Sequence, residues 1–248
     1  MLKTYLLQLI PTEAVELPVE KLTVNLHGML YHQLPHGIAD AWHDAPVSPF
    51  TLFTFSRHNT WHAIIKVMTQ EAIRVFDSLL VENPTPQFVL RATKSVPIEV
   101  RVLSTKERTL QQLSQPNSIS LTKVRLHFKS PTTFRVKGKY QLYPELRLIW
   151  QSLLMKYRWL ADGEFESDEV LLAALVEATH ITNSQIKNRY AVVHKSGIKG
   201  FVGSVDIAID ATEEVQQLLH QLLQLVEFTS IGIKGALGMG HIHVEYLA

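Results

Sequence analysis

The sequence predicts an α+β protein built from two tandem ferredoxin-like (RRM-like) βαββαβ units. Its 248 residues suffice for two units of about 120 residues each. Hydrophobic residues make up 46% and charged residues 19% of the chain, a globular composition that excludes a disordered or fibrous protein. The order strand, helix, strand, strand, helix, strand occurs twice along the chain. We therefore expect one domain over residues 1–115 and a second over residues 116–248.

The first unit is defined by the spacing of its apolar residues and by its prolines. Pro11 closes the first strand and Pro35 ends the first helix. Thr69 can cap the second helix, and Pro84 and Pro86 follow it. The expected elements are a strand over residues 3–10, a helix over 19–34, a loop over 35–49, strands over 50–56 and 61–68, a helix over 70–81 and a strand over 96–103.

The second unit follows a polar linker over residues 114–120 and repeats this order. Ser167 and Thr212 are the expected caps of its last two helices. The expected elements are a strand over residues 121–129, helices over 144–160 and 168–180, strands over 187–194 and 201–209 with a bend over 197–203, a helix from 212 to about 228 and a strand over 241–247.

Cysteine is absent, which excludes disulfide scaffolds, thiolate metal sites and cysteine nucleophiles. The N-terminal segment has no small-residue cleavage site. No window approaches 18 uninterrupted apolar residues, so no membrane span is expected. These features predict a cytoplasmic protein without a membrane partner.

The 12 histidines raise the question of a metal site. His27 and His32 are five residues apart, so they do not share a helix face as an i, i+4 pair would. His241 and His243 alternate on a strand but have no obvious further ligands. The chain also lacks an H-E-x-x-H motif, a G-x-S-x-G elbow and a phosphate loop between strand and helix. We expect no metal and no cofactor.

The net charge of +1 conceals an uneven distribution. Residues 121–158 contain nine basic residues and one acidic residue, whereas residues 159–248 contain five basic and 12 acidic residues. The basic block is consistent with a surface that binds a polyanion. It is equally consistent with surface charges that pair with the acidic segment in space.

A glycine-rich segment, GIKGALGMG, occupies residues 232–240 and contains Lys234. Exposed backbone N–H groups in such a loop can bind phosphate. The glycines can instead permit close packing against another element and bind nothing. Spacing alone does not decide between the two interpretations.

Several segments resemble one known family. GIKGALGMGHI is similar to the glycine-rich loop of the CRISPR-associated repeat-processing endoribonucleases, the Cas-six family. Residues 124–157 resemble the family's central strand, basic hairpin and following helix, and residues 195–207 its glycine-containing strand. LHGMLYHQL, WHD and SPFTLFTFSR resemble its first helix, active-site loop and second strand. The segments occur in the family's order over most of the chain.

The resemblance implies a metal-independent endoribonuclease that cleaves precursor CRISPR RNA within its repeats and produces mature guide RNA. The ribose 2′-OH attacks the adjacent phosphate, which leaves a 2′,3′-cyclic phosphate. By position, His43 matches the family's general base. Tyr31 matches a tyrosine that helps to orient the reacting groups or to protonate the leaving oxygen in relatives. His32 and His36 are neighbours that could replace His43.

One departure concerns a lysine that often precedes the Pro-Phe of the second strand, where this chain has Ser48. Arg57, Lys66 or Lys234 could supply the missing positive charge. A second departure is Ser230, which stands where the family's loop usually begins with a further glycine.

The resemblance also implies RNA contact by the basic hairpin and the loop. Arg135, Lys137 and Lys139 alternate along a segment expected to be extended, so their side chains would share one face. Arg125 and Lys129 on the adjoining strand would support them. The loop residues implied in RNA binding are Lys234, Gly232, Gly235, Gly238 and Gly240.

An alternative interpretation is a catalytically inactive subunit that binds repeat RNA within an effector complex, which Ser48 favours slightly. The expected partners are precursor and mature CRISPR RNA and other effector-complex subunits. The chain would be a monomer or a homodimer.

Overall fold

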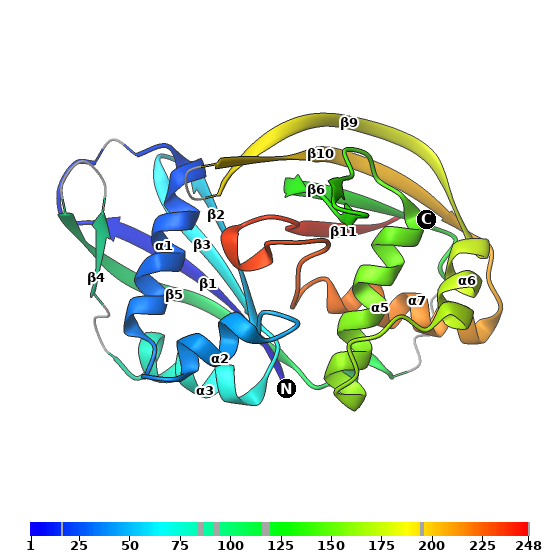
Figure 1. The fold of residues 1–248 in the computed structure, drawn as a ribbon, viewed down its shortest axis with the longest axis horizontal. Helices are drawn as coiled ribbons and strands as arrows, with labels where there is room; N and C mark the ends of the chain where they lie inside the picture. Colours follow the sequence, from blue (N-terminus) through cyan, green and yellow to red (C-terminus); the bar gives the residue numbers. More distant parts are fainter. Residues whose placement is uncertain (16, 84–86, 92–94, 116–119, 194–195, 248) are drawn as a thin grey trace.

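The computed structural model describes residues 1–15, 17–83, 87–91, 95–115, 120–193 and 196–247. Its long strands form two separate antiparallel sheets, with helices packed against each (Figure 1). The first sheet belongs to the N-terminal part of the chain and the second to the C-terminal part. The domain boundary expected at residue 115 adjoins residues outside the described range and stays a prediction.

The first sheet has the strand order β2-β3-β1-β5-β4. Its first strand lies between the third and the last strand of the βαββαβ pattern, and β4 is added at the edge. The elements of this unit are β1 (Leu2–Pro11), α1 (Val19–Gln33), α2 (Ile38–Asp44), β2 (Phe50–Arg57), β3 (Thr60–Val67), α3 (Gln70–Leu80), β4 (Gln87–Arg91), β5 (Ser95–Arg108) and α4 (Leu110–Leu113). The sequence did not predict β4, which has only five residues.

The second sheet has the strand order β11-β6-β10-β9, which is the same arrangement relative to the chain. Its elements are β6 (Lys123–Thr132), β7 (Arg135–Val136), β8 (Lys139–Tyr140), α5 (Leu146–Asp162), α6 (Glu169–Glu177), β9 (Thr179–Val193), β10 (Ser196–Ile209), α7 (Glu213–Leu225), the 3₁₀-helix η1 (Gly235–Leu237) and β11 (Ile242–Leu247). The predicted fold class of two tandem ferredoxin-like units is therefore confirmed.

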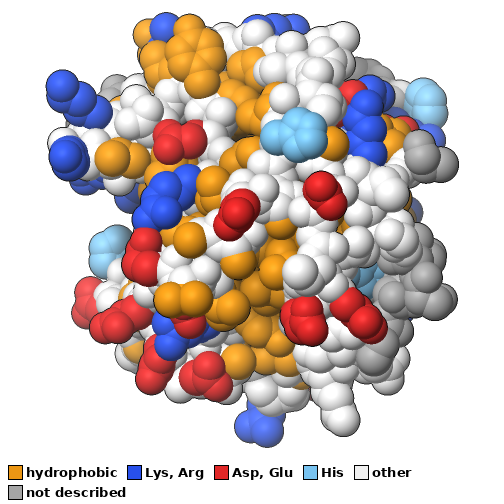
Figure 2. Space-filling model, turned by 90° about the vertical axis from the view of Figure 1, so that its right-hand side faces the viewer, with side chains coloured by type: hydrophobic (Ala, Val, Ile, Leu, Met, Phe, Trp, Pro, Cys, Tyr) orange, Lys and Arg blue, Asp and Glu red, His pale blue; other side chains and the backbone are white. Residues whose placement is uncertain are grey.

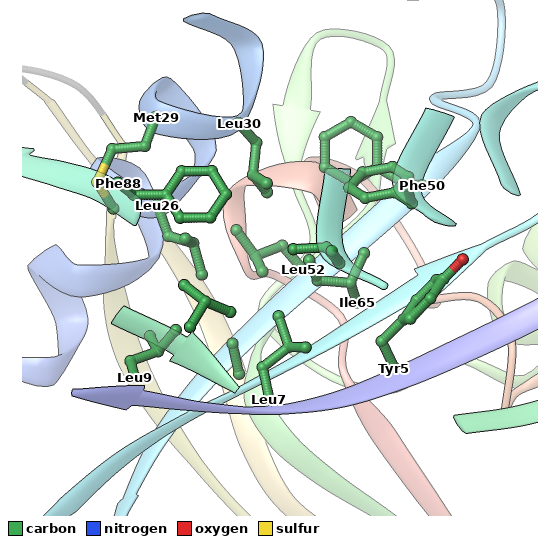
Figure 3. Close-up of a cluster of buried hydrophobic side chains, with 14 of the residues drawn as sticks. Tyr5, Leu7, Leu9, Leu26, Met29, Leu30, Phe50, Leu52, Ile65 and Phe88 are labelled. Atoms are coloured by element: carbon green, nitrogen blue, oxygen red, sulfur yellow. The ribbon is translucent and has the colours of Figure 1, made fainter. Parts of the chain in front are cut away.

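Each sheet packs its apolar face against its own helices. In the first unit, alternate residues of β1 such as Leu7 and Leu9 meet Leu26 and Leu30 of α1 (Figure 3). Burying a side chain of this size contributes about 1.5–3 kcal/mol. The expected cap of α3 is confirmed, because the Thr69 hydroxyl accepts a hydrogen bond from the Ala72 amide.

The segment before β2 differs from the expectation. Residues 35–49 were expected to form a loop, yet seven of them form α2. The helix starts after Gly37, whose φ of 84° suits glycine, and ends before Pro46. A helix this short carries little periodic signal, and it depends on Trp42, which is buried in the core.

Three expectations for the second unit were also wrong. The cap of α6 is Asp168 and not Ser167, because its carboxylate accepts from the amides of Val170 and Leu171. The strand β9 starts at Thr179, eight residues earlier than expected. The expected bend over residues 197–203 lies inside β10, where the register shifts between Phe201 and Gly203. The expected ends at Pro84, Pro86 and residue 194 fall outside the described residues.

The two units contact each other along several elements. The β9–β10 hairpin extends from the second unit toward α1 of the first (Figure 1). Val193 and Ile198 of this hairpin pack on Leu237 and Met239 of the glycine-rich loop. A separate contact places the ring of Phe53 parallel to that of His241, with 4.1 Å between the ring centroids.

Two glycines provide a matched test of this backbone geometry. A methyl group added at Gly240 would lie 1.9 Å from the Ile231 carbonyl oxygen, and the φ of Gly240 is +72°. Gly28 lies in α1 with open space around it. We expect Gly240→Ala to lower the free energy of unfolding by more than about 1 kcal/mol. Gly28→Ala should raise it by about 0.5–1 kcal/mol in the same urea titration. Equal effects would contradict the described loop.

Candidate functional site at the junction of the two units

The glycine-rich loop lies between the units and contacts the first one directly. A methyl group at Gly238 would lie 2.5 Å from Thr23 Cγ2 of α1, and one at Gly235 would lie 2.9 Å from Thr51 Cγ2 of β2. These glycines therefore permit close packing, which was one of the two interpretations of the segment. A larger residue at Gly238 would first displace the loop from α1.

A cleft of about 730 Å³ opens beside this loop. Its walls come from α1, α2, the start of β2, α5 and the loop itself. Tyr31 and His43 of the first unit line it together with Lys234 of the second. Gly232 and Gly235 also line it. The cleft thus collects residues from both units that are distant in sequence.

Tyr31 projects from α1 and is half-buried among aromatic rings. Its ring centroid lies 4.5 Å from that of His27 and 5.9 Å from that of Phe50. Burial raises the pKa of the Tyr31 hydroxyl above its ordinary value of 10.0. The hydroxyl therefore remains protonated near neutral pH and can donate a hydrogen bond.

His43 is held at the cleft by its neighbour in α2. Trp42 packs its ring against Phe50 and Phe76, at centroid distances of 5.8 and 6.0 Å. This packing anchors the short helix, and His43 in its last turn remains exposed and accessible from the cleft. His27 also lines the cleft and was missed, although its i, i+4 spacing with Tyr31 on one helix face would have indicated it.

The alternates to His43, and the candidate cation Arg57, do not line the cleft. His32 lines an adjoining hollow of about 790 Å³ beside α1 and β4, which shares Gly28 and Tyr31 with the cleft. His36 is exposed and precedes α2. Arg57 is the last residue of β2, whereas the cleft lies beside the start of that strand, at Thr51. Among the described residues that line the cleft, none of these three occurs.

Two buried lysines hold the segment that leads into the glycine-rich loop. Lys66 of β3 donates hydrogen bonds to the carbonyl oxygens of Val226 and Thr229, at 2.6 and 2.9 Å. Lys156 of α5 donates to the Ser230 carbonyl at 2.5 Å. Burial lowers the pKa of Lys66 to about 7 and that of Lys156 to about 8.

Of the candidate cations, Lys66 does not line the cleft, whereas Lys234 does. Lys156 also lines it, and the sequence analysis missed this residue. The sequence did contain a signal for burial of this lysine: it lies on the apolar stripe of α5, seven residues after Ile149 and three after Leu153.

About half of the basic block forms ion pairs with the acidic segment. Arg125 makes two bonds to the Asp206 carboxylate, at 2.5 and 2.9 Å, so its charge is balanced. The other ion-paired members of the block are Lys123 with Asp206, Arg147 with Glu169 and Arg158 with Glu164. Figure 2 shows the end of the molecule formed by the second unit, where acidic side chains gather around an apolar band.

Three of the five remaining cations of the block belong to the short β7–β8 hairpin, whereas Lys129 lies on β6 and Lys156 on α5. Arg135, Lys137 and Lys139 are exposed and form no ion pair within the described part of the chain. The expected extended segment is wrong, because Lys137 and Gly138 have φ of 47° and 81° and turn the chain. Arg135 pairs with Tyr140 in the hairpin, so Arg135 and Lys139 lie on opposite faces.

This hairpin is joined to the loop by backbone hydrogen bonds. The Ile233 amide donates to the Thr133 carbonyl at 3.2 Å, and the Gly240 amide donates to the Pro131 carbonyl at 3.1 Å. The exposed cations of the hairpin are therefore attached to the element that forms one wall of the cleft.

Within the described residues, no group of three or more His, Asp or Glu side chains is placed to hold a metal ion. No helix in the described part of the chain is both long and apolar enough to cross a membrane.

Comparison with known proteins gives a consistent result. A family model described as CRISPR-associated endoribonuclease Cas6 matches residues 126–242. The chain is 29% identical to the Cas6 endoribonuclease of Mycobacterium tuberculosis, with 98% of this chain and 80% of that protein covered. It is 28% identical to that of Streptococcus thermophilus, with 93% and 94% covered.

Solved structures of Cas6 proteins have a fold similar to that of this chain. A Cas6 product complex is 27% identical, with a TM-score of 0.74 and 99% of this chain and 100% of that chain covered. A Thermus thermophilus Cas6 shares the fold at 21% identity and a TM-score of 0.72, with 99% and 98% covered.

The two sheets and the loop between them define a protein of the tandem ferredoxin-like class, with a glycine-rich loop at the junction of its units. The matches extend over both units and not over the loop alone. The chain is therefore similar over both of its units to the CRISPR-associated endoribonuclease Cas6 proteins.

The buried Lys66 generates a stability prediction. Its pKa is about 7 in the folded protein and about 10.5 when unfolded, so the unfolded state binds more protons between these values. Stability therefore rises with pH in this window. From pH 7.5 to 9.5, the native protein should gain about 2–3 kcal/mol relative to Lys66→Met, measured by denaturant unfolding. Parallel pH dependence of the two proteins would contradict the lowered pKa.

Proposed function

We propose that this protein cleaves precursor CRISPR RNA within its repeats without a metal ion, leaving a 2′,3′-cyclic phosphate and a 5′-OH. The observation that carries the proposal is the cleft, in which Tyr31 and His43 of one unit lie with Lys234 of the other. A base, a hydrogen-bond donor and a cation are the groups that this reaction needs.

The chemistry is divided among these residues. His43 takes the proton of the ribose 2′-OH as the oxygen attacks the neighbouring phosphorus. The bond from phosphorus to the 5′ oxygen breaks, and the Tyr31 hydroxyl orients or protonates that leaving oxygen. Lys234 adds positive charge near the phosphate. One similar Cas6 has been solved both as a substrate mimic complex and as a histidine-to-alanine mutant, which supports the choice of a histidine for this role.

The β7–β8 hairpin supplies the RNA-binding surface in this proposal. Arg135, Lys137 and Lys139 are free of carboxylates in the described structure, and the base of the hairpin is bonded to the loop. A phosphate backbone bound along these side chains leads toward the cleft. Lys129 on β6 is exposed and lines a hollow with Lys187 and Arg189 of β9, whereas Arg125 forms an ion pair with Asp206.

Ser48 favours the second candidate, a repeat-binding subunit without catalysis. Ser48 lines the cleft at the position where the family often has a lysine, and its hydroxyl donates to the Phe50 carbonyl at 2.9 Å. The two candidates differ in whether repeat RNA is cut.

The first prediction concerns cleavage. In EDTA, the native protein should cut repeat RNA, and a 2′-deoxy nucleotide at the cleavage site should abolish the reaction. We expect His43→Ala to lower the single-turnover rate by about 100-fold or more with little change in affinity, because a general base acts in the transition state. His32→Ala is the matched control and should cut at the native rate. Binding without cleavage by the native protein would favour the inactive subunit.

The second prediction concerns binding. Replacement of Arg135, Lys137 and Lys139 by Ala should weaken RNA binding and reduce the slope of log affinity against log salt by up to about 2 if all three contact phosphates, at roughly 0.7 per contact on single strands. Arg147→Ala with Arg158→Ala removes two charges that already pair with Glu169 and Glu164. This control should leave the slope unchanged, and an unchanged slope in the triple variant would show that the hairpin is a solvated surface.

A further inference from the structure

Lys156 is an unusual residue for the wall of an open cleft. Its side chain comes from the buried stripe of α5, and the residue is only 7% exposed. Its ammonium group bonds to the Ser230 carbonyl, and the residue lines the cleft together with Ser230 and Lys234. No carboxylate forms an ion pair with it in the described part of the chain, and no Asp or Glu occurs among the described residues that line the cleft.

Comparison with Lys66 separates two roles for a buried lysine. Both ammonium groups hold carbonyls of the same segment, residues 226–230. Lys66 is bonded to two carbonyls and lines a different hollow, of about 260 Å³, so its ammonium group is not directed to the cleft that contains Tyr31 and His43. Lys156 is bonded to one carbonyl, and an ammonium group has three N–H donors. Lys156 therefore has donors left for a ligand in the cleft.

We propose that Lys156 contacts a nonbridging oxygen of the scissile phosphate, and that it supplies the positive charge that Ser48 cannot. This inference rests on the proposed function and adds a residue to it. As the 2′ oxygen bonds to phosphorus, negative charge grows on the nonbridging oxygens. A fixed cation in a site of low dielectric stabilises that charge with little reorganisation, because its bond to Ser230 already orients it.

The surroundings of Lys156 set how this contact depends on pH. The titratable groups around it are Lys66 from β3, His27 and Tyr31 from α1, His43 from α2 and Lys234 from the loop. Because burial lowers the pKa of Lys156 to about 8, free protein loses this charge above pH 8. The single-turnover cleavage rate at subsaturating protein concentration should therefore fall as the pH rises above 8. An arginine at this position stays charged throughout.

The test compares Lys156→Met, Lys156→Arg and Lys66→Met with the native protein on repeat RNA. Single-turnover rates are measured from pH 6 to 10, and affinity is measured with RNA that carries a 2′-deoxy nucleotide at the cleavage site. Lys156→Met should lower the rate at pH 7.5 by about 100-fold, with affinity within about 3-fold. Lys156→Arg should restore much of the rate and shift the alkaline fall above pH 9. Lys66→Met should keep the alkaline fall at its native position.

The results that would overturn the proposed role of Lys156 are as distinct as the expected ones. Native rates in Lys156→Met would overturn the role of Lys156 and leave the proposed function intact. If the alkaline fall disappears in Lys66→Met, the titration belongs to Lys66, and the proposed role of Lys156 is overturned. Absence of cleavage by the native protein would overturn the proposed function, and this inference with it. Circular dichroism on each variant confirms that a lost rate comes from a folded protein.

Discussion

The bond between the Lys66 ammonium and the end of α7 is the constraint on which the rest of the site depends. The last carbonyls of a helix have no partner within the helix and must be satisfied when they are buried. Lys66 reaches from the first unit to do this at Val226 and Thr229 of the second. These residues directly precede the glycine-rich loop, so one side chain fixes where that loop starts relative to α1 and α2.

The candidate site is composite, because neither unit contains it alone. Tyr31 and His43 come from helices of the first unit, whereas Lys156 and Lys234 come from the second. Their separation depends on how closely the loop approaches α1 and β2, and Gly235 and Gly238 permit that approach. The glycines therefore influence the geometry of the candidate site through the packing of the two units.

The charge distribution follows from the same packing. Folding brings the acidic segment against α5 and β6, where it pairs with Arg125, Arg147 and Arg158. Within the basic block, three of the cations that form no ion pair in the described structure lie on the hairpin that is bonded to the loop. The interpretation as paired surface charge is therefore confirmed for the ion-paired members of the block, whereas polyanion binding by the hairpin stays a prediction.

The sequence by itself determined the two βαββαβ units, because apolar spacing, prolines and caps such as Thr69 are local signals. It also indicated Tyr31, His43 and Lys234 through motif resemblance. It could not determine α2, since a seven-residue helix is stabilised mainly by the burial of Trp42. For Lys156 the sequence contained only a weak signal, a single polar residue in the apolar stripe of α5, and it left His32 as an alternative to His43. Only the tertiary structure decided which side chains share the cleft, because that depends on contacts between residues far apart in the chain.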